Sequence, residues 1–147
     1  MGLHRTIDAN LEAAPDRVFD ALERLDDYGR WLDLVAAVEP ATAQSDEDHA
    51  WLVTLRAKIG PFARAKRLRM VRTIADRPSR LRFERAEVDG RDHAGWIFDI
   101  AIAGLPDLAT HVHVELNYEG GLWSTPIEAV LGSQVDNAVP KLQGLLG

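Results

Sequence analysis

The sequence contains no cysteine among its 147 residues. This absence excludes disulfides, zinc–thiolate sites, iron–sulfur clusters and thiol nucleophiles. No apolar run approaches the ~18 residues that are needed to cross a bilayer, and the first residues lack the apolar centre of a secretory signal. From the length and these absences we expect one domain over residues 1–147, located in the cytoplasm.

Several catalytic motifs are also missing. There is no Gly-x-Ser-x-Gly nucleophile motif, no phosphate-binding glycine loop and no dinucleotide fingerprint. We therefore expect no cofactor. Catalysis stays an open alternative, and a non-catalytic function is favoured.

Acidic residues are scarce in one part of the chain. Between Arg56 and Arg85 eleven residues are basic and two are acidic, whereas the chain as a whole has a net charge of −6. Such asymmetry is typical of contact with an anionic membrane or an acidic protein, and it also fits basic strands that pair with acidic neighbours. The acidic pI of about 5.3 argues against nucleic acid. Strand alternation predicts the convex face of a sheet for three pairs of these residues, Arg56/Lys58, Arg64/Lys66 and Arg80/Arg82.

Residue spacing predicts the first half of the chain as a strand, two short helices and then more strands. Residues 4–11 alternate, and Pro15 followed by Asp16 is a helix-start signal. A second short helix is expected through Tyr28 and Trp31, and residues 40–48 are expected to form a loop. From Trp51 onward the apolar period changes to two, which predicts five strands at residues 51–59, 63–74, 80–84, 96–102 and 111–118.

The C-terminal segment predicts one long helix, from Thr125 to Leu146. Thr125 is a capping residue, Pro126 occupies the first helical position and Glu128 is a capping-box partner. Strands segregated from helices are typical of an α+β fold with an antiparallel sheet. We expect a curved sheet wrapped around this long helix.

With this order of elements the sequence resembles the START and birch-pollen-allergen-like (SRPBCC) superfamily, which has the helix-grip fold. Within it, the sequence is most similar to the polyketide-cyclase-like and carbon-monoxide-dehydrogenase-subunit-G-like proteins of bacteria. The resemblance spans essentially the whole chain, and these segments carry it: Ala14-Pro15-Asp16-x-Val18-Phe19-x-x-Leu22, Asp27-Tyr28-x-x-Trp31, Lys58-Ile59-Gly60-Pro61-Phe62, Arg77-Pro78-Ser79-Arg80-Leu81-Arg82-Phe83 and the terminal helix.

The resemblance implies a cavity for a small hydrophobic ligand between the sheet and the last helix. Trp31 is expected near the mouth of this cavity, and the amides of Gln134 and Asn137 are expected to orient a ligand. Core packing for the aromatic residues and solvent contact for the two amides are the alternatives. The candidate ligand-binding residues are Phe19, Trp31, Leu55, Met70, Phe83, Trp96, Phe98, Val114, Val130, Gln134 and Asn137.

His111-x-His113 is the only spacing that is typical of a metal site, with Glu115 next on the same face. Two histidines and a carboxylate do bind metals in other proteins. Alternation, however, turns these side chains away from the apolar face of Val112 and Val114. We therefore expect solvated strand histidines and no metal.

These observations favour binding or transport of a small lipid-, polyketide- or aromatic-like molecule. Two alternatives remain. One is a polyketide cyclase or aromatase, whose polar catalytic groups the sequence does not identify. The other is a non-catalytic accessory protein that docks through the basic strands.

Overall fold

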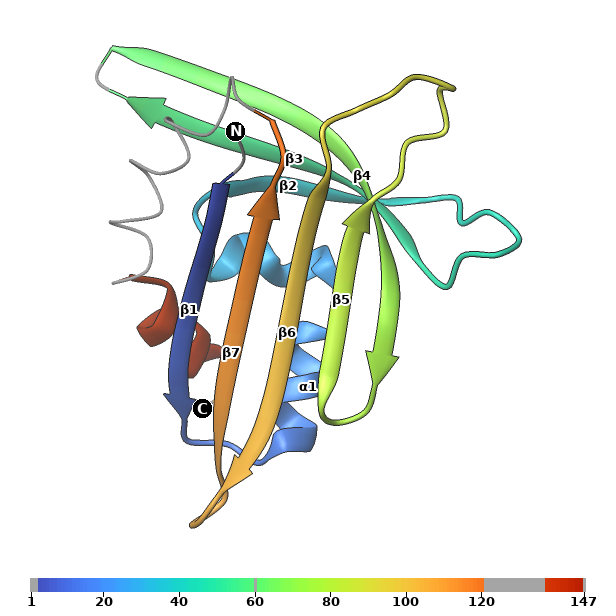
Figure 1. Ribbon diagram of the computed structural model, residues 1–147. Coiled ribbons are helices and arrows are strands. Elements are labelled where there is room, and N and C mark those ends of the chain that lie inside the picture. The colour runs from blue at the N-terminus through green and yellow to red at the C-terminus, as the bar shows by residue number, and fades with distance from the viewer. Residues whose placement is uncertain (1–2, 60, 121–136, 147) are drawn as a thin grey trace.

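The computed structural model describes residues 3–59, 61–120 and 137–146. In this part of the chain seven strands form one antiparallel sheet in the order β1-β7-β6-β5-β4-β3-β2 (Figure 1). The strands are β1 (Leu3–Leu11), β2 (Val35–Ala41), β3 (Ala50–Ile59), β4 (Phe62–Asp76), β5 (Arg80–Arg85), β6 (Trp96–Leu105) and β7 (Ala109–Tyr118).

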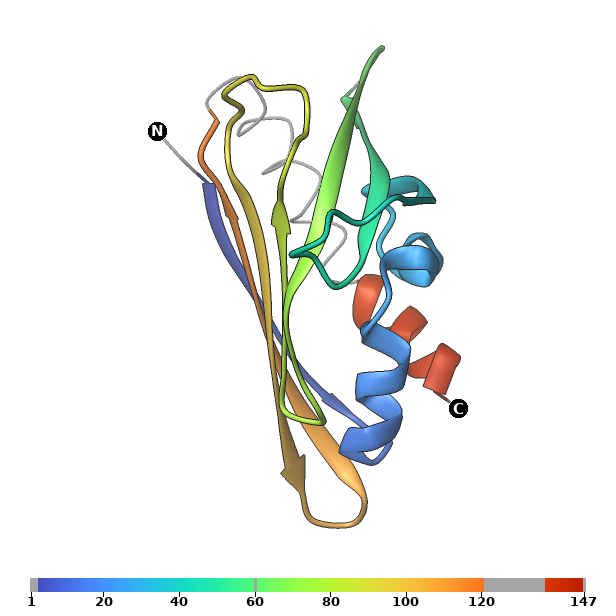
Figure 2. The ribbon, with the colours of Figure 1, turned by 90° about the vertical axis from the view of Figure 1, so that its right-hand side faces the viewer.

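Three helical segments cover the concave face of this sheet. Helix α1 (Pro15–Leu22) begins with proline at its first turn, where the missing N–H has no partner to lose. It is followed by the 3₁₀-helix η1 (Leu25–Arg30). Residues 137–146 form the third helical segment, and Figure 2 shows all three on the same side of the sheet.

Strand alternation places the core between the sheet and these helices. Along β6 every second side chain is buried, from Trp96 through Phe98 and Ile100 to Ile102. The Tyr28 ring of η1 meets Phe83 and Phe98 edge-on, with centroid distances of 5.9 and 5.8 Å. Its hydroxyl donates a hydrogen bond to the Leu22 carbonyl at 2.7 Å, which ties η1 to the end of α1.

The α+β class, the curved antiparallel sheet and the two short helices after the first strand are confirmed. The second of these helices is of the 3₁₀ type and ends at Arg30, with Trp31 as its C-cap. Of the helix expected from Thr125 to Leu146, residues 137–146 are helical and residues 125–136 lie outside the described part of the chain.

One strand differs from expectation. Residues Val35–Ala41 form β2, which pairs with β3 at the edge of the sheet. Pro40 lies within it, and an edge strand tolerates proline because one side of its backbone needs no ladder hydrogen bonds. The loop predicted for residues 40–48 therefore begins only after Ala41.

Candidate functional site

A cavity lies between the concave face of the sheet and η1. Its volume is about 80 Å³, several times the ~10–15 Å³ that one water requires. Among the described residues, the wall is formed almost entirely by apolar side chains of β1, η1, the segment after η1 and strands β2 to β7. The lining residues are Arg5, Ile7, Leu25, Tyr28, Leu32, Leu34, Val35, Val53, Leu55, Leu68, Met70, Phe83, Trp96, Phe98, Val114 and Leu116.

The structure brings six of the predicted site residues together around this cavity: Leu55, Met70, Phe83, Trp96, Phe98 and Val114. Their common face follows from the register, because Phe83 lies opposite Phe98 across the β5–β6 pair. Their role in ligand binding stays a prediction.

The other predicted site residues lie elsewhere. The buried Phe19 ring lies under the guanidinium of Arg77, whose carbon is 4.5 Å from the ring centroid. Asn137 is exposed. Val130 and Gln134 lie outside the described residues.

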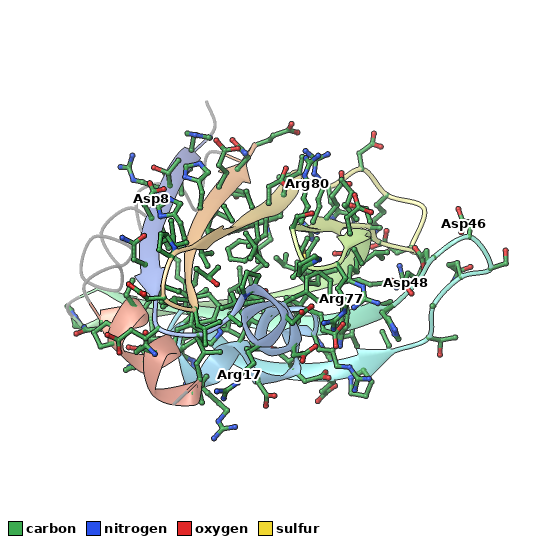
Figure 3. All side chains as sticks on the ribbon, turned by 90° about the horizontal axis from the view of Figure 1, so that it is seen from below. Asp8, Arg17, Asp46, Asp48, Arg77 and Arg80 are labelled. Carbon is green, nitrogen blue, oxygen red and sulfur yellow. The ribbon has the colours of Figure 1, made fainter. Side chains whose placement is uncertain are left out.

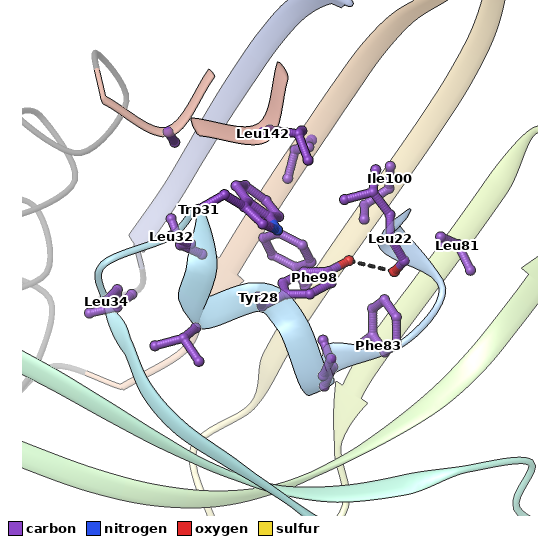
Figure 4. Close-up of a cluster of buried hydrophobic side chains, with 14 of the residues drawn as sticks. Leu22, Tyr28, Trp31, Leu32, Leu34, Leu81, Phe83, Phe98, Ile100 and Leu142 are labelled. Carbon is purple, nitrogen blue, oxygen red and sulfur yellow. Dashed lines mark hydrogen bonds between the residues drawn. The ribbon is translucent and has the colours of Figure 1, made fainter. Parts of the chain in front are cut away.

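Trp31 lines a second, smaller cavity under the C-terminal helix. This cavity measures about 20 Å³ and includes Ala138 and Leu142 of that helix in its wall. Only 4% of Trp31 is exposed, and Figure 4 shows it beside Phe98 and Leu142. The Trp31 indole is thus buried next to the main cavity. It does not lie at the mouth of that cavity, where the resemblance placed it.

Tyr28 is a cavity residue that is absent from the sequence-based candidates. Its hydrogen bond to the Leu22 carbonyl is drawn in Figure 4, and burial raises the pKa of its hydroxyl. The sequence does contain a signal for Tyr28, because Leu25, Tyr28 and Trp31 recur at three-residue spacing, which is typical of one face of a helix.

Few polar groups of the described residues reach the cavity. The Tyr28 hydroxyl is already engaged, and the buried indole N–H of Trp96 has no hydrogen-bond partner among the described residues. Arg5 is the one charged side chain among the described residues of the wall. An apolar hollow with a few polar groups is typical of small-molecule sites.

Comparison with solved structures identifies the fold. A protein from Thermus thermophilus superposes with a TM-score of 0.71 at 16% identity, covering 98% of this chain and 97% of that one. A START superfamily protein from Mycobacterium smegmatis gives 0.72 at 11% identity, covering 97% and 96%. The Zhui aromatase/cyclase from a Streptomyces species gives 0.68 at 12% identity, covering 99% and 94%.

The chain has the START-like helix-grip fold. No model of a protein family matches the sequence, and no curated protein matches it either. At these identities the likeness establishes the fold, and the narrower resemblance to the polyketide-cyclase or subunit-G branch stays a prediction.

Many basic residues of the sheet are neutralised by carboxylates of this chain. Figure 3 shows Asp46 and Asp48 on the loop between β2 and β3, and Asp48 binds Arg72 at 2.6 Å. Seven basic residues between Arg56 and Arg85 form ion pairs with carboxylates of this chain: Arg67 with Glu39, Arg69 with Glu47, Arg72 with Asp48, Arg77 with Asp16 and Asp20, Arg80 and Arg82 with Asp99, and Arg85 with Glu87.

The expectation that Arg64 and Lys66 lie on the convex face is wrong. In the β3–β4 pair Lys66 lies opposite Leu55 and Arg64 opposite Ala57, and both partners are buried on the concave side. Directly opposed residues of an antiparallel pair share a face. Lys66 is therefore half-buried on the side of the cavity.

His111 and His113 lie on the convex face of β7, as expected. Asp8 of β1, labelled in Figure 3, contacts His113 Nδ1 at 2.7 Å and His111 Nε2 at 3.1 Å. The hydrogen bond with Asp8 raises the pKa of His113 and lowers the pKa of Asp8 itself. Within the described residues no group of three or more histidine, aspartate or glutamate side chains is arranged for a metal ion.

The described part of the chain includes no helix with the length and apolarity needed to cross a membrane.

Proposed function

We propose that the chain binds a small hydrophobic ligand, for storage or transport, in the cavity between the sheet and η1. The observation that carries this proposal is the apolar hollow of about 80 Å³ in the core, about four times the volume of the second cavity beside Trp31. Folded cores leave few voids larger than a water molecule, because empty space forfeits dispersion contacts. A void of this size lined by Leu55, Phe98 and Val114 is the space that a ligand would fill.

The lining also sets the chemistry of the ligand. Burial of apolar surface yields about 25 cal/mol per Å², so an apolar body supplies most of the affinity. The unpartnered indole N–H of Trp96 offers one directed hydrogen bond to an acceptor on the ligand.

A polyketide aromatase or cyclase is the second candidate, because one of the solved structures with this fold is described as an aromatase/cyclase. Such chemistry needs groups that move protons. Among the described lining residues the only hydroxyl is that of Tyr28, which is bound to a backbone carbonyl and has a raised pKa. Binding without turnover is therefore the better-supported function, and the internal ion pairs of the basic strands weigh against the docking alternative.

The test is a titration with the neutral fluorophore N-phenyl-1-naphthylamine. Val53→Trp places an indole in the cavity, so we expect probe affinity to fall by at least about tenfold while the fold is retained. Leu52→Trp is the matched control, because it adds the same side chain to the neighbouring residue on the opposite face of β3. Equal probe affinity in both variants and the wild type would rule out this cavity as the site.

Native mass spectrometry with organic extraction of the purified protein complements the titration. Release of a bound apolar molecule supports the proposal. Conversion of an extracted or added polyketide into a cyclised product would instead favour the enzyme.

A further inference from the structure

We infer that the ligand is an acidic amphiphile, whose apolar body fills the cavity and whose carboxylate is held by the ammonium group of Lys66, with Arg5 nearby. This inference rests on the proposed function and specifies the class of ligand. Three observations on the described residues carry it: the position of Lys66 beside the cavity wall, the sign of its charge and that of Arg5, and the absence of a described carboxylate that neutralises the lysine.

Lys66 lies beside the cavity wall, although it is not itself one of the lining residues. Its cross-strand partner Leu55 and its neighbour on the same face, Leu68, both line the cavity. Its Nζ lies 5.8 Å from the centroid of the Tyr118 ring, which is stacked at 4.4 Å on the ring of the cavity residue Trp96. The ammonium group therefore lies near the Tyr118 ring, one aromatic ring away from the cavity wall.

Arg5 lies on the same concave face. It lines the cavity and lies opposite Leu116 in the β1–β7 pair, so Tyr118 is its diagonal neighbour on the concave face. Diagonal neighbours across antiparallel strands are about 7–8 Å apart, within reach of an arginine side chain. Arg5 is thus a second cationic residue on the concave face, on the strand position diagonal to Tyr118.

Arg5 and Lys66 are both cationic, although the chain as a whole carries −6. No aspartate or glutamate occurs among the described residues of the cavity wall, and no described carboxylate lies within ion-pair distance of Lys66. The nearby Glu87 already binds Arg85 at 2.7 Å. Burial lowers the pKa of Lys66 and the charge of Arg85 lowers it further, while Glu87 acts in the opposite direction.

An anionic head group on the ligand supplies the counter-ion that Lys66 lacks among the described residues. A carboxylate beside Lys66 forms a charge-assisted hydrogen bond and compensates the partial desolvation of the ammonium. A neutral ligand with the same tail fills the cavity but leaves the ammonium without a counter-ion. The structure therefore predicts that the protein binds an anionic ligand more tightly than a neutral or cationic ligand of equal length.

The experiment compares decanoate, decanol and decylamine as competitors of N-phenyl-1-naphthylamine at about pH 8, where the carboxylic acid is ionised. We expect the wild type to bind decanoate about tenfold more tightly than decanol, with decylamine weakest. In Lys66→Met decanoate should lose this advantage while decanol keeps its affinity, and Lys66→Arg should restore the preference.

Arg67→Met is the matched control. It removes the same charge from the adjacent residue, but Arg67 faces outward and binds Glu39 at 2.7 Å, so the preference for decanoate should persist. Equal affinity of the wild type for decanoate and decanol, or a preference that survives in Lys66→Met, would overturn the charge inference and leave the proposed function intact. Failure of every competitor and of the probe to bind would overturn both.

Discussion

At the scale of single residues, Tyr28 connects the sheet side of the cavity to the end of α1. Its ring is buried against Phe83 and Phe98 from the sheet, and its hydroxyl satisfies the Leu22 carbonyl at the end of α1. A buried carbonyl left without a donor costs free energy. The hydroxyl therefore adds one directed contact to the ring packing that holds η1 over the cavity.

Tyr28→Phe tests this contact. Removing the hydroxyl leaves the Leu22 carbonyl unsatisfied, so we expect the free energy of unfolding to fall by about 1–3 kcal/mol, measured by urea denaturation. Tyr118→Phe is the control, since the Tyr118 hydroxyl has no hydrogen bond to the described residues and its loss should change stability by less than about 0.5 kcal/mol. Equal losses in the two variants would contradict this account of Tyr28.

At the scale of elements, a buried arginine fastens the loop between β2 and β3. Arg69 is 4% exposed, and its guanidinium binds both carboxylate oxygens of Glu47 at 2.6 and 3.0 Å. It also donates to the carbonyls of Thr42 and Ala86 at 2.8 Å. One side chain of β4 thus holds the loop before β3 and the segment after β5.

Arg69→Met should destabilise the protein by about 3–5 kcal/mol, because Glu47 and the two carbonyls lose their donor in a buried site. Arg67→Met is the comparison on the same face of β4. The Arg67–Glu39 pair is more than half exposed on both sides, and such pairs contribute about 0–1 kcal/mol. Chemical denaturation of both variants measures the difference, and similar losses would show that burial does not set the value of these pairs.

The pairing of β1 with β7 should depend on pH through Asp8 and His113. Asp8 raises the pKa of His113 in the folded state. The stabilisation from protonated His113 is therefore fully present below the pKa of His113 in the unfolded chain, about 6.5. It is lost as pH rises through the folded-state pKa. The pKa of Asp8 is lowered, so its contribution is present above about 3.8 and is lost as pH falls through the folded pKa. Stability from this pair is therefore greatest between these two values.

Hydrogen exchange of the β1 amides across this pH range measures the effect. Protection should decline on the alkaline side in the wild type, and this decline should vanish in Asp8→Asn. A wild-type profile that matches the Asp8→Asn profile on the alkaline side would refute the linkage.

At the scale of the whole molecule, Trp31 separates two hollows under the helices. The small cavity that it lines shares Ile7 and Val114 with the main cavity, and Trp31 lies 5.0 Å from the ring of the main-cavity residue Tyr28. Removing the indole therefore joins the two spaces into one longer cavity that reaches the C-terminal helix.

Trp31→Ala should lower the free energy of unfolding by about 3–5 kcal/mol, as expected for a large-to-small change in a core. It should also shift ligand preference from decanoate toward hexadecanoate, because the longer tail fills the joined space. Denaturation and probe displacement measure the two effects. A variant that keeps wild-type stability and the same length preference would show that Trp31 does not divide the cavity.

The order of elements was predictable because it depends on local spacing. Alternation from Trp51 to Tyr118 identified five strands, and Pro15 with the Val18 and Leu22 spacing identified the first helix. β2 was missed because Pro40 and three alanines among its seven residues give a weak strand signal. Its pairing with β3, and not its own propensity, makes this segment a strand.

The arrangement of the cavity depends on contacts between residues that are distant in the sequence. Alternation correctly grouped Phe83, Phe98 and Val114, but the position of Trp31 against the C-terminal helix and the role of Tyr28 follow from how the helices pack on the sheet. The Lys66 ammonium lies over the Tyr118 ring, although two strands separate β4 from β7 in the sheet order. Local periodicity specifies which face a side chain takes, whereas the curvature of the whole sheet sets which side chains meet across the concave side.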